Sequence, residues 1–256
     1  MFTDRTSLQT RGYADHGALA ARLSIYDYQV DRLDLLGLAV TALGGVHGAI
    51  LDAGCGLGNY TARLRADRPD LRVLPLDLSA GMGPEVVGDV QALPVRTDAI
   101  DAALAMHMLY HVPDIPAAVR ELRRVVRPGR VLLVSTNGLA DKQEIGELMS
   151  AALTDLTGSP QRWPAADDRF SLDDGPLLEA SFDEVTVEVF ERETVVPAAE
   201  PVVAFVDSFE GLSQRSLPAG LDWPALMARV EARVRDEVAR TGAWRMANQI
   251  GLFTCR

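Results

Sequence analysis

A glycine-rich turn constrains this chain more than any other feature of its sequence. The segment Ile50–Tyr60 is an apolar run that leads through alternate glycines, Gly54, Gly56 and Gly58, into a polar stretch. Glycines let the backbone take left-handed turns and approach a ligand without a Cβ in between. Asp52, just before the turn, would repel a phosphate and suits a cation or an ammonium group. The segment therefore predicts a strand, a ligand-binding loop and a helix.

The glycine spacing separates this loop from the dinucleotide-binding fingerprint. GxGxxG requires a third glycine at the position that Asn59 occupies here. A nicotinamide dehydrogenase would share the α/β architecture that the rest of the chain predicts. The spacing makes it the less favoured alternative.

From Gly48 onward, short apolar runs alternate with helical stretches, which is typical of a mostly parallel sheet covered by helices. The clearest helix is expected at 115–126, after Asp114 and before Pro128. Pro75 lies inside an expected strand and predicts a bulge, or pairing that begins only beyond it. The strands are expected at about 49–53, 71–77, 85–88, 99–106, 130–135, 185–190 and 245–254.

We expect one domain over residues 1–256, with an α/β, Rossmann-like, mostly parallel sheet of about seven strands and helices on both faces. Apolar residues at helical spacing from 19 to 43 indicate an N-terminal helical cap, in which Tyr26 is expected to pack. Two later connections are too long for ordinary loops and predict insertions near the ligand site. The expected parts are the cap (1–45), the cofactor-binding core (46–136), lid or acceptor insertions (137–180 and 197–243) and final strands (182–196 and 244–256).

Charge and composition exclude several classes of partner. The formal net charge of −11 opposes binding to nucleic acid or anionic lipid, which relies on clustered Lys and Arg. Cys55 and Cys255 show no metal-ligand spacing, so neither a zinc site nor a disulfide framework is expected. The sequence shows no membrane-spanning run and no signal-peptide pattern. We expect a cytoplasmic protein without nucleic-acid, membrane or metal partners.

Four further motifs follow the glycine loop in order, and each coincides with an expected strand end or with a helix and its turn. They lie at 76–79, 88–94, 106–114 and 122–131. With Asp52 and the three glycines, they make the chain resemble the class I S-adenosylmethionine-dependent methyltransferases of the small-molecule type. The resemblance implies S-adenosyl-L-methionine as the cofactor and a small molecule as the methyl acceptor.

The resemblance also implies roles for individual residues. Asp77 would accept hydrogen bonds from both ribose hydroxyls, and Asp89 would face the adenine amine. The segment with His107 and His111 would lie near the transferred methyl group. The implied cofactor-binding set is Tyr13, Asp52, Gly54, Gly56, Asp77, Leu78, Met82, Asp89, Val90 and His107.

Several of these residues have a structural interpretation as well. Met82 either contacts adenine or fills the core. His107 and His111 are candidate catalytic bases, because histidine titrates near neutrality, and each has a structural alternative. Trp163 and Phe170 either line an acceptor pocket or pack. Tyr13 is expected to close over the cofactor.

The predicted function is methyl transfer from S-adenosylmethionine to an O, N or C nucleophile of a small molecule, expected to be a metabolite. The alternative from another class is a cofactor-binding protein of the same fold without methyl transfer, such as a cyclase. The sequence leaves the acceptor, the need for a general base and the oligomeric state open.

Overall fold

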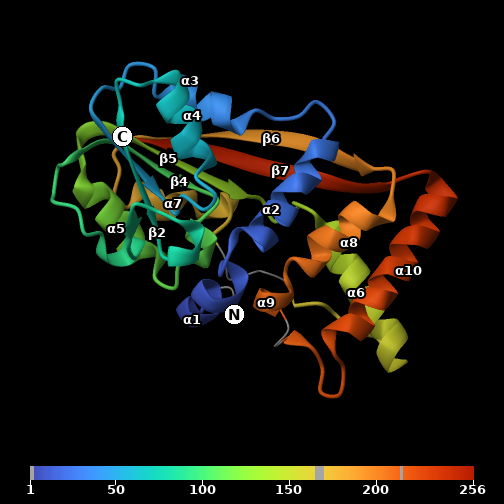
Figure 1. Ribbon diagram of the computed structural model, residues 1–256. Helices are drawn as coiled ribbons and strands as arrows, with labels where there is room; N and C mark the ends of the chain where they lie inside the picture. Colours follow the sequence, from blue (N-terminus) through green and yellow to red (C-terminus); the bar gives the residue numbers. More distant parts are fainter. Residues whose placement is uncertain (1–2, 165–169, 214–215) are drawn as a thin grey trace.

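A seven-stranded sheet forms the centre of the computed structural model, which describes residues 3–164, 170–213 and 216–256 (Figure 1). Its strand order is β3-β2-β1-β4-β5-β7-β6. The first five strands are parallel, and β7 runs antiparallel to β5 and β6. The bounds are β1 Ala49–Ala53, β2 Arg72–Asp77, β3 Val86–Val87, β4 Ile100–Met106, β5 Val126–Asn137, β6 Val185–Val196 and β7 Trp244–Cys255. The predicted Rossmann-like, mostly parallel sheet is confirmed.

Strand β2 runs through Pro75 without a bulge. Asp52 of β1 is paired with Pro75 in continuous register. On the other side, β3 pairs only with Leu76 and Asp77, beyond the proline. The hydrogen bonds between β2 and β3 therefore do not involve Pro75, whose backbone nitrogen carries no hydrogen. The expected bulge is absent, whereas the expected pairing beyond the proline holds on the β3 side.

Helices cover both faces of the sheet, with α3 (Leu35–Ala42) and α4 (Asn59–Asp67) on one and α5 (Ile115–Val125) and α7 (Gly175–Glu179) on the other (Figure 1). The start of α5 shows the signals expected from the sequence. The Asp114 side chain accepts from the backbone N–H of Ala117, and a proline occupies the first turn.

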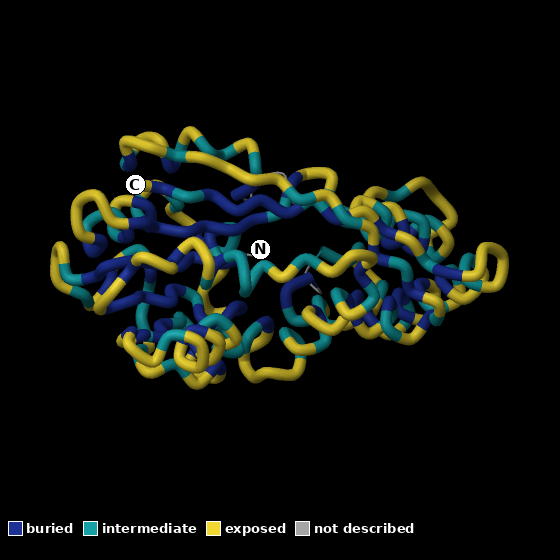
Figure 2. Tube along the Cα trace, turned by 90° about the horizontal axis from the view of Figure 1, so that it is seen from above, coloured by how far each residue is buried: buried dark blue, intermediate teal, exposed yellow. Residues whose placement is uncertain are grey.

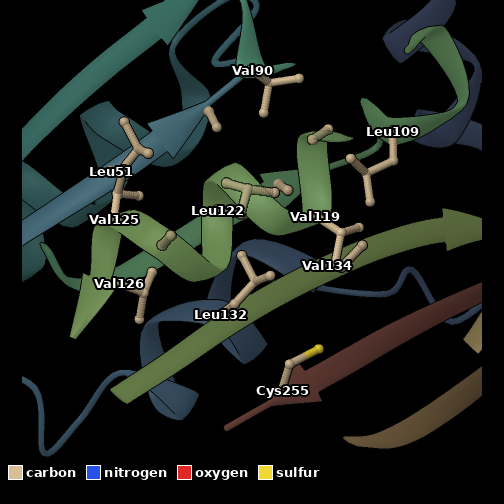
Figure 3. Packing of buried hydrophobic residues seen from close by; sticks show 14 of the residues in the cluster. Leu51, Val90, Leu109, Val119, Leu122, Val125, Val126, Leu132, Val134 and Cys255 are labelled. Atoms are coloured by element: carbon tan, nitrogen blue, oxygen red, sulfur yellow. The ribbon is translucent and has the colours of Figure 1, made fainter. Parts of the chain in front are cut away.

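The buried stripe of α5 packs on the sheet. Val119, Leu122 and Val125 are fully buried and lie over Leu132 and other strand residues (Figure 3). Burial of each such side chain contributes about 1.5–3 kcal/mol. This packing fixes the strand ends that carry the site.

A second group of helices lies beyond the sheet, at the far ends of β6 and β7 (Figure 1). It consists of α6 (Gln143–Thr157), α8 (Ala199–Asp207), α9 (Glu210–Ser213) and α10 (Trp223–Thr241), which we call the helical lobe. Figure 2 shows buried segments along the central strands and a further buried group within this lobe. Its own core includes Leu148, Val202 and Trp223.

The N-terminal cap is broken into short helices: α1 (Arg5–Ser7), η1 (Leu8–Gly12), α2 (His16–Ser24) and η2 (Ile25–Tyr28). The helical periodicity from 19 to 43 is interrupted at Gln29, which forms an antiparallel bridge with Thr194 of β6. Short helical turns elsewhere are η3 (Ala80–Met82), η4 (Val90–Ala92), η5 (Leu109–His111) and η6 (Leu172–Asp174). None of the helices in the described ranges is long and apolar enough to cross a membrane.

Candidate functional site

A cavity of about 1660 Å³ lies at the carboxyl ends of the parallel strands, bordered by the cap and the helical lobe. Small-molecule pockets usually measure about 300–1000 Å³. The cavity therefore has room for a cofactor and a second molecule. Its position is the one at which open α/β sheets bind ligands.

The glycine loop and the end of β2 form one wall of this cavity. Gly54 and Gly56 have φ values of +69° and +51°, which side chains rarely adopt. A Cβ on Gly54 would lie 2.8 Å from the Met108 Cβ, and one on Gly56 would lie 3.0 Å from Leu19. Both positions therefore require glycine, and the loop lines the cavity as a cradle of bare backbone.

Asp77 ties this loop to the strand behind it. Its carboxylate accepts hydrogen bonds from the backbone N–H groups of Gly56 at 3.0 Å and Ser79 at 2.9 Å. Burial raises the pKa of Asp77 above its ordinary value, against the effect of these bonds. The side chain lines the cavity and leaves acceptor capacity for a ligand hydroxyl.

The cap closes the neighbouring wall through polar contacts. Arg5 forms an ion pair with Asp89, whose carboxylate also accepts from the backbone N–H of Gln91 at 2.9 Å. The side-chain amide of Gln9 donates to the Leu78 carbonyl at 2.9 Å. The cap is therefore attached directly to Leu78 and Asp89, two residues of the expected cofactor-binding set.

Tyr13 lies at the centre of the cap's contact with the core. Its Oη is 2.6 Å from Nε2 of His111, and the two rings meet edge to face at 5.1 Å. Arg22 donates from Nη1 to the same Tyr13 oxygen at 2.9 Å and from Nη2 to the Gly12 carbonyl at 2.8 Å. The structure thus brings together Tyr13 and His111, two of the candidate site residues.

Arg22 is a cavity residue that the sequence reasoning missed. Its side chain is buried, and its guanidinium carbon lies 4.7 Å and 5.1 Å from the ring centroids of Tyr13 and Phe209. Its hydrogen-bond partners among the described residues are neutral oxygens. A buried cation with neutral partners favours an anionic ligand nearby. The signal in the sequence was an arginine at helical spacing from Leu19 and Tyr26.

Two residues of the expected set lie behind the cavity wall. The Asp52 side chain is 1% exposed and accepts from the Thr61 hydroxyl at 2.6 Å, and burial raises its pKa to about 6. Met82 is also buried and does not line the cavity. The other expected residues do line it: Tyr13, Gly54, Gly56, Asp77, Leu78, Asp89, Val90, His107 and His111.

His107 follows β4 in a left-handed conformation, with φ +52°. Its backbone N–H donates to the carbonyl and to the hydroxyl of Ser135, both at 3.0 Å. Burial and the nearby positive charge of Lys142 lower the His107 pKa to about 4. The imidazole is therefore neutral at neutral pH and a weak proton acceptor.

The two aromatic residues of the first insertion both pack and both line the cavity. Trp163 meets Trp223 edge to face with ring centroids 6.4 Å apart, and Phe170 lies 6.2 Å from Phe253. Residues 165–169 of this insertion lie outside the described ranges. In the described part of the chain, no group of His, Cys, Asp and Glu side chains has the arrangement of a metal site.

Comparison with known proteins identifies relatives of the sequence core. A family model described as a methyltransferase domain matches residues 51–134. The malonyl-[acyl-carrier protein] O-methyltransferase of Serratia marcescens is 37% identical over 108 residues, covering 38% of this chain and 42% of that protein. The enzyme of the same name from Yersinia pestis is 30% identical over 149 residues, covering 52% and 55%. The chain thus spans about half the length of the curated relatives it matches.

Solved structures share the fold at low identity. A Haemonchus contortus phosphoethanolamine N-methyltransferase 2 in complex with S-adenosyl-L-methionine superposes with a TM-score of 0.55 and 15% identity, covering 100% of this chain and 60% of that one. The YcgJ protein of Bacillus subtilis superposes with a TM-score of 0.53 and 16% identity, covering 86% and 96%. These similarities support the fold alone.

Proposed function

We propose that the chain transfers a methyl group from S-adenosylmethionine to an oxygen of a small-molecule acceptor. The premise is that residues 51–134 are a class I S-adenosylmethionine-dependent methyltransferase domain. The observation that carries the proposal is the cradle of Gly54, Gly56 and Asp77 in a cavity with room for two molecules. The O-methyltransferase names of the curated relatives support oxygen as the nucleophile.

The residues around the cradle fit this cofactor. Gly54 and Gly56 line the cavity with backbone that carries no side chain, and Asp77 offers carboxylate oxygens to ribose hydroxyls. Asp89 would meet the adenine end, where it now pairs with Arg5. Arg22 supplies positive charge for the cofactor's carboxylate. The bound cofactor supplies a sulfonium methyl group, which is an electrophile.

The chain contributes alignment and exclusion of water. Residues of the cap and of the helical lobe line the same cavity as the glycine loop, so an acceptor in this cavity would be held near the carboxyl ends of β4 and β5. Holding the nucleophile in line with the methyl group provides a large proximity effect. His107 remains neutral there and accepts a proton weakly, which favours acceptors that ionise readily.

We assign acceptor recognition to the cap (1–45) and to the insertions 137–180 and 197–243. Their described residues provide the cavity wall that faces the cofactor cradle, including Trp163, Phe205 and Phe209. The cofactor-binding core (46–136) carries the glycine loop, and the strands β6 and β7 connect it to the helical lobe. In this proposal the cap serves both sites, because Tyr13 and Arg22 belong to it.

Two measurements test the proposed function. Calorimetry should detect binding of S-adenosylmethionine or its demethylated product, with no comparable affinity for NAD or NADP. A screen of acceptors with methyl-labelled cofactor should then yield a labelled product, and malonyl-[acyl-carrier protein], named for the curated relatives, belongs in that screen. Nicotinamide binding without sulfonium binding would refute the cofactor assignment. Cofactor binding with a rearranged, unmethylated product would favour the cyclase alternative.

A further inference from the structure

A buried polar cluster lies where the cap meets the start of α6. Lys142, the only lysine of the chain, donates from Nζ to Asp141 Oδ2 at 2.7 Å and to Tyr26 Oη at 2.9 Å. The side chains of Lys142 and Asp141 are 9% and 6% exposed. Nζ also lies 4.7 Å from the centroid of the Tyr26 ring. The expectation that Tyr26 merely packs therefore omitted the contact of its hydroxyl with a buried cation.

The cluster is anchored to β7 by backbone bonds. Asp141 Oδ1 accepts from the backbone N–H of Gln249 at 3.1 Å, and the Lys142 N–H donates to the Ala247 carbonyl at 2.9 Å. Lys142 has a φ of +51°, a conformation that a non-glycine residue retains only where its surroundings hold it. The ammonium group is therefore fixed in position before a ligand enters.

The position of the cluster is on the acceptor side of the cavity. Tyr26, Asp141 and Lys142 all line the cavity together with His107. The charges of Lys142 and Asp141 both act on the His107 imidazole, which places the cluster near the residue that follows β4. Between them, the cap and α6 thus present polar groups next to the expected path of the methyl group.

Two hydrogen-bond donors of this cluster have no partner among the described residues. An ammonium group has three N–H donors, and two of those of Lys142 are engaged. Tyr26 Oη accepts from Lys142 and retains its own proton for donation. Two donors at one point of a cavity suit an oxygen that carries negative charge. Asp141 is engaged by Lys142 and by β7, so it orients the ammonium group.

The surroundings of this donor pair are apolar. Ile145, Met149 and Phe205 line the same cavity and belong to the core of the helical lobe or pack against it. A ligand with its charged oxygen on Lys142 would lay an apolar body along these side chains. The combination selects for an amphipathic molecule.

We propose that Tyr26 and Lys142 bind an oxyanion, a carboxylate or a phenolate, of an acceptor with an apolar body, and that Asp141 is a positioning residue for Lys142. This assignment rests on the proposed function. In the transfer, an acceptor oxygen forms the new O–CH₃ bond as the S–CH₃ bond breaks, and the electron pair of that bond stays on sulfur. An oxyanion has no proton to lose, so the step needs no general base.

The test measures binding of matched probes to the wild-type protein saturated with S-adenosylhomocysteine. Decanoate is compared with decanamide, and 4-nitrophenolate with 4-nitroanisole, by calorimetry. We expect at least one charged probe to bind about tenfold or more tightly than its neutral partner, the effect of hydrogen bonds to a charged group. The pair that shows the preference identifies the oxyanion as carboxylate or phenolate.

Lys142→Met should abolish the preference, and Tyr26→Phe should reduce it, with unchanged affinity for S-adenosylhomocysteine. Arg162→Met, which removes an exposed cation at the same cavity, should keep it. A preference that survives both Lys142→Met and Tyr26→Phe, or none in the wild type, would overturn the assignment. If Lys142→Met does not fold, Tyr26→Phe, which removes one hydroxyl, decides alone. Failure of the wild type to bind S-adenosylhomocysteine would instead overturn the proposed function, and this assignment with it.

Discussion

The replacement Asp52→Asn should stabilise the cofactor-free protein at neutral pH. Asp52 is almost completely buried at the end of β1, and burial raises its pKa from 3.8 to about 6 in spite of the hydrogen bond from Thr61. The charged form is thus less stable in the folded protein than in the unfolded chain. Asparagine has nearly the same shape, carries no charge and still accepts a hydrogen bond from Thr61.

The size and pH range of the effect follow from this pKa. Below pH 3.8 the carboxyl is protonated in both states and adds no pH dependence. Between about pH 4 and 6 the folded state keeps a proton that the unfolded chain releases, so stability falls as the pH rises. Above about pH 6 the carboxyl is charged in both states, and the loss of folding stability is complete. It amounts to about 3 kcal/mol at most, because a difference of one in pKa corresponds to about 1.4 kcal/mol. Asp52→Asn should recover about 1–3 kcal/mol of it.

Urea unfolding of both proteins at pH 4.5 and pH 7.5 measures this gain. The free energy of unfolding of the variant should exceed that of the wild type at pH 7.5. At pH 4.5 the two values should differ much less. Thr61→Val is the matched control: it removes the donor to the buried carboxylate and should destabilise the protein most at pH 7.5. An Asp52→Asn variant that is less stable at pH 7.5 than at pH 4.5, relative to the wild type, would refute the reasoning.

Three further predictions concern the cavity. Asp77→Ala should weaken cofactor binding about 10- to 150-fold by calorimetry, the equivalent of about 1.5–3 kcal/mol for hydrogen bonds to a charged group; an unchanged affinity would show that Asp77 only holds the loop. Gly56→Val should abolish cofactor binding in a protein that keeps its circular dichroism spectrum, because φ is +51° and a Cβ would meet Leu19; normal binding would mean that the loop does not face the cofactor. His107, with a pKa of about 4, stays neutral at pH 6–8, so the pH–rate profile of His107→Ala should keep the shape of the wild-type profile in that range; loss of an inflection near neutrality would contradict this.

The elements with local signals were predictable from the sequence. β1 has the expected bounds, and α5 ends only one residue earlier than expected, at Val125. The signals for α5 are local: Asp114 caps its start, a buried stripe runs along it, and Pro128 follows its end. Helix α8 was missed, because it lies in the stretch 197–243 that was expected only as an insertion. Pro201 lies in the first turn of that helix, where the backbone N–H groups have no helical partner to lose.

The residues of the candidate site also divide into those that the sequence pattern could place and those that it could not. The residues at strand ends, such as Asp77 and His107, were placed by the topology of a parallel sheet. Lys142 and Tyr26 are 116 residues apart and meet only because β7 and the cap hold them there. Gln29 interrupts the cap for a similar reason, its contact with Thr194. No periodicity within either segment carries such information.

The final two strands join the central sheet to the helical lobe, to which we assign part of the acceptor site. Both have 12 residues, but β7 pairs with β5 only from Ile250 to Cys255, so residues 244–249 continue with β6 as a two-stranded ribbon beyond the sheet. The helical lobe packs on this ribbon, and their shared hydrophobic core includes Val196 and Met246 of the ribbon and Ile25 of the cap. The buried residues under the central sheet belong to other clusters. We therefore expect substitutions within the lobe to leave the central sheet folded. The ribbon is therefore the place at which we would join this sheet to a different lobe in a chimeric protein, to test whether the lobe sets the acceptor.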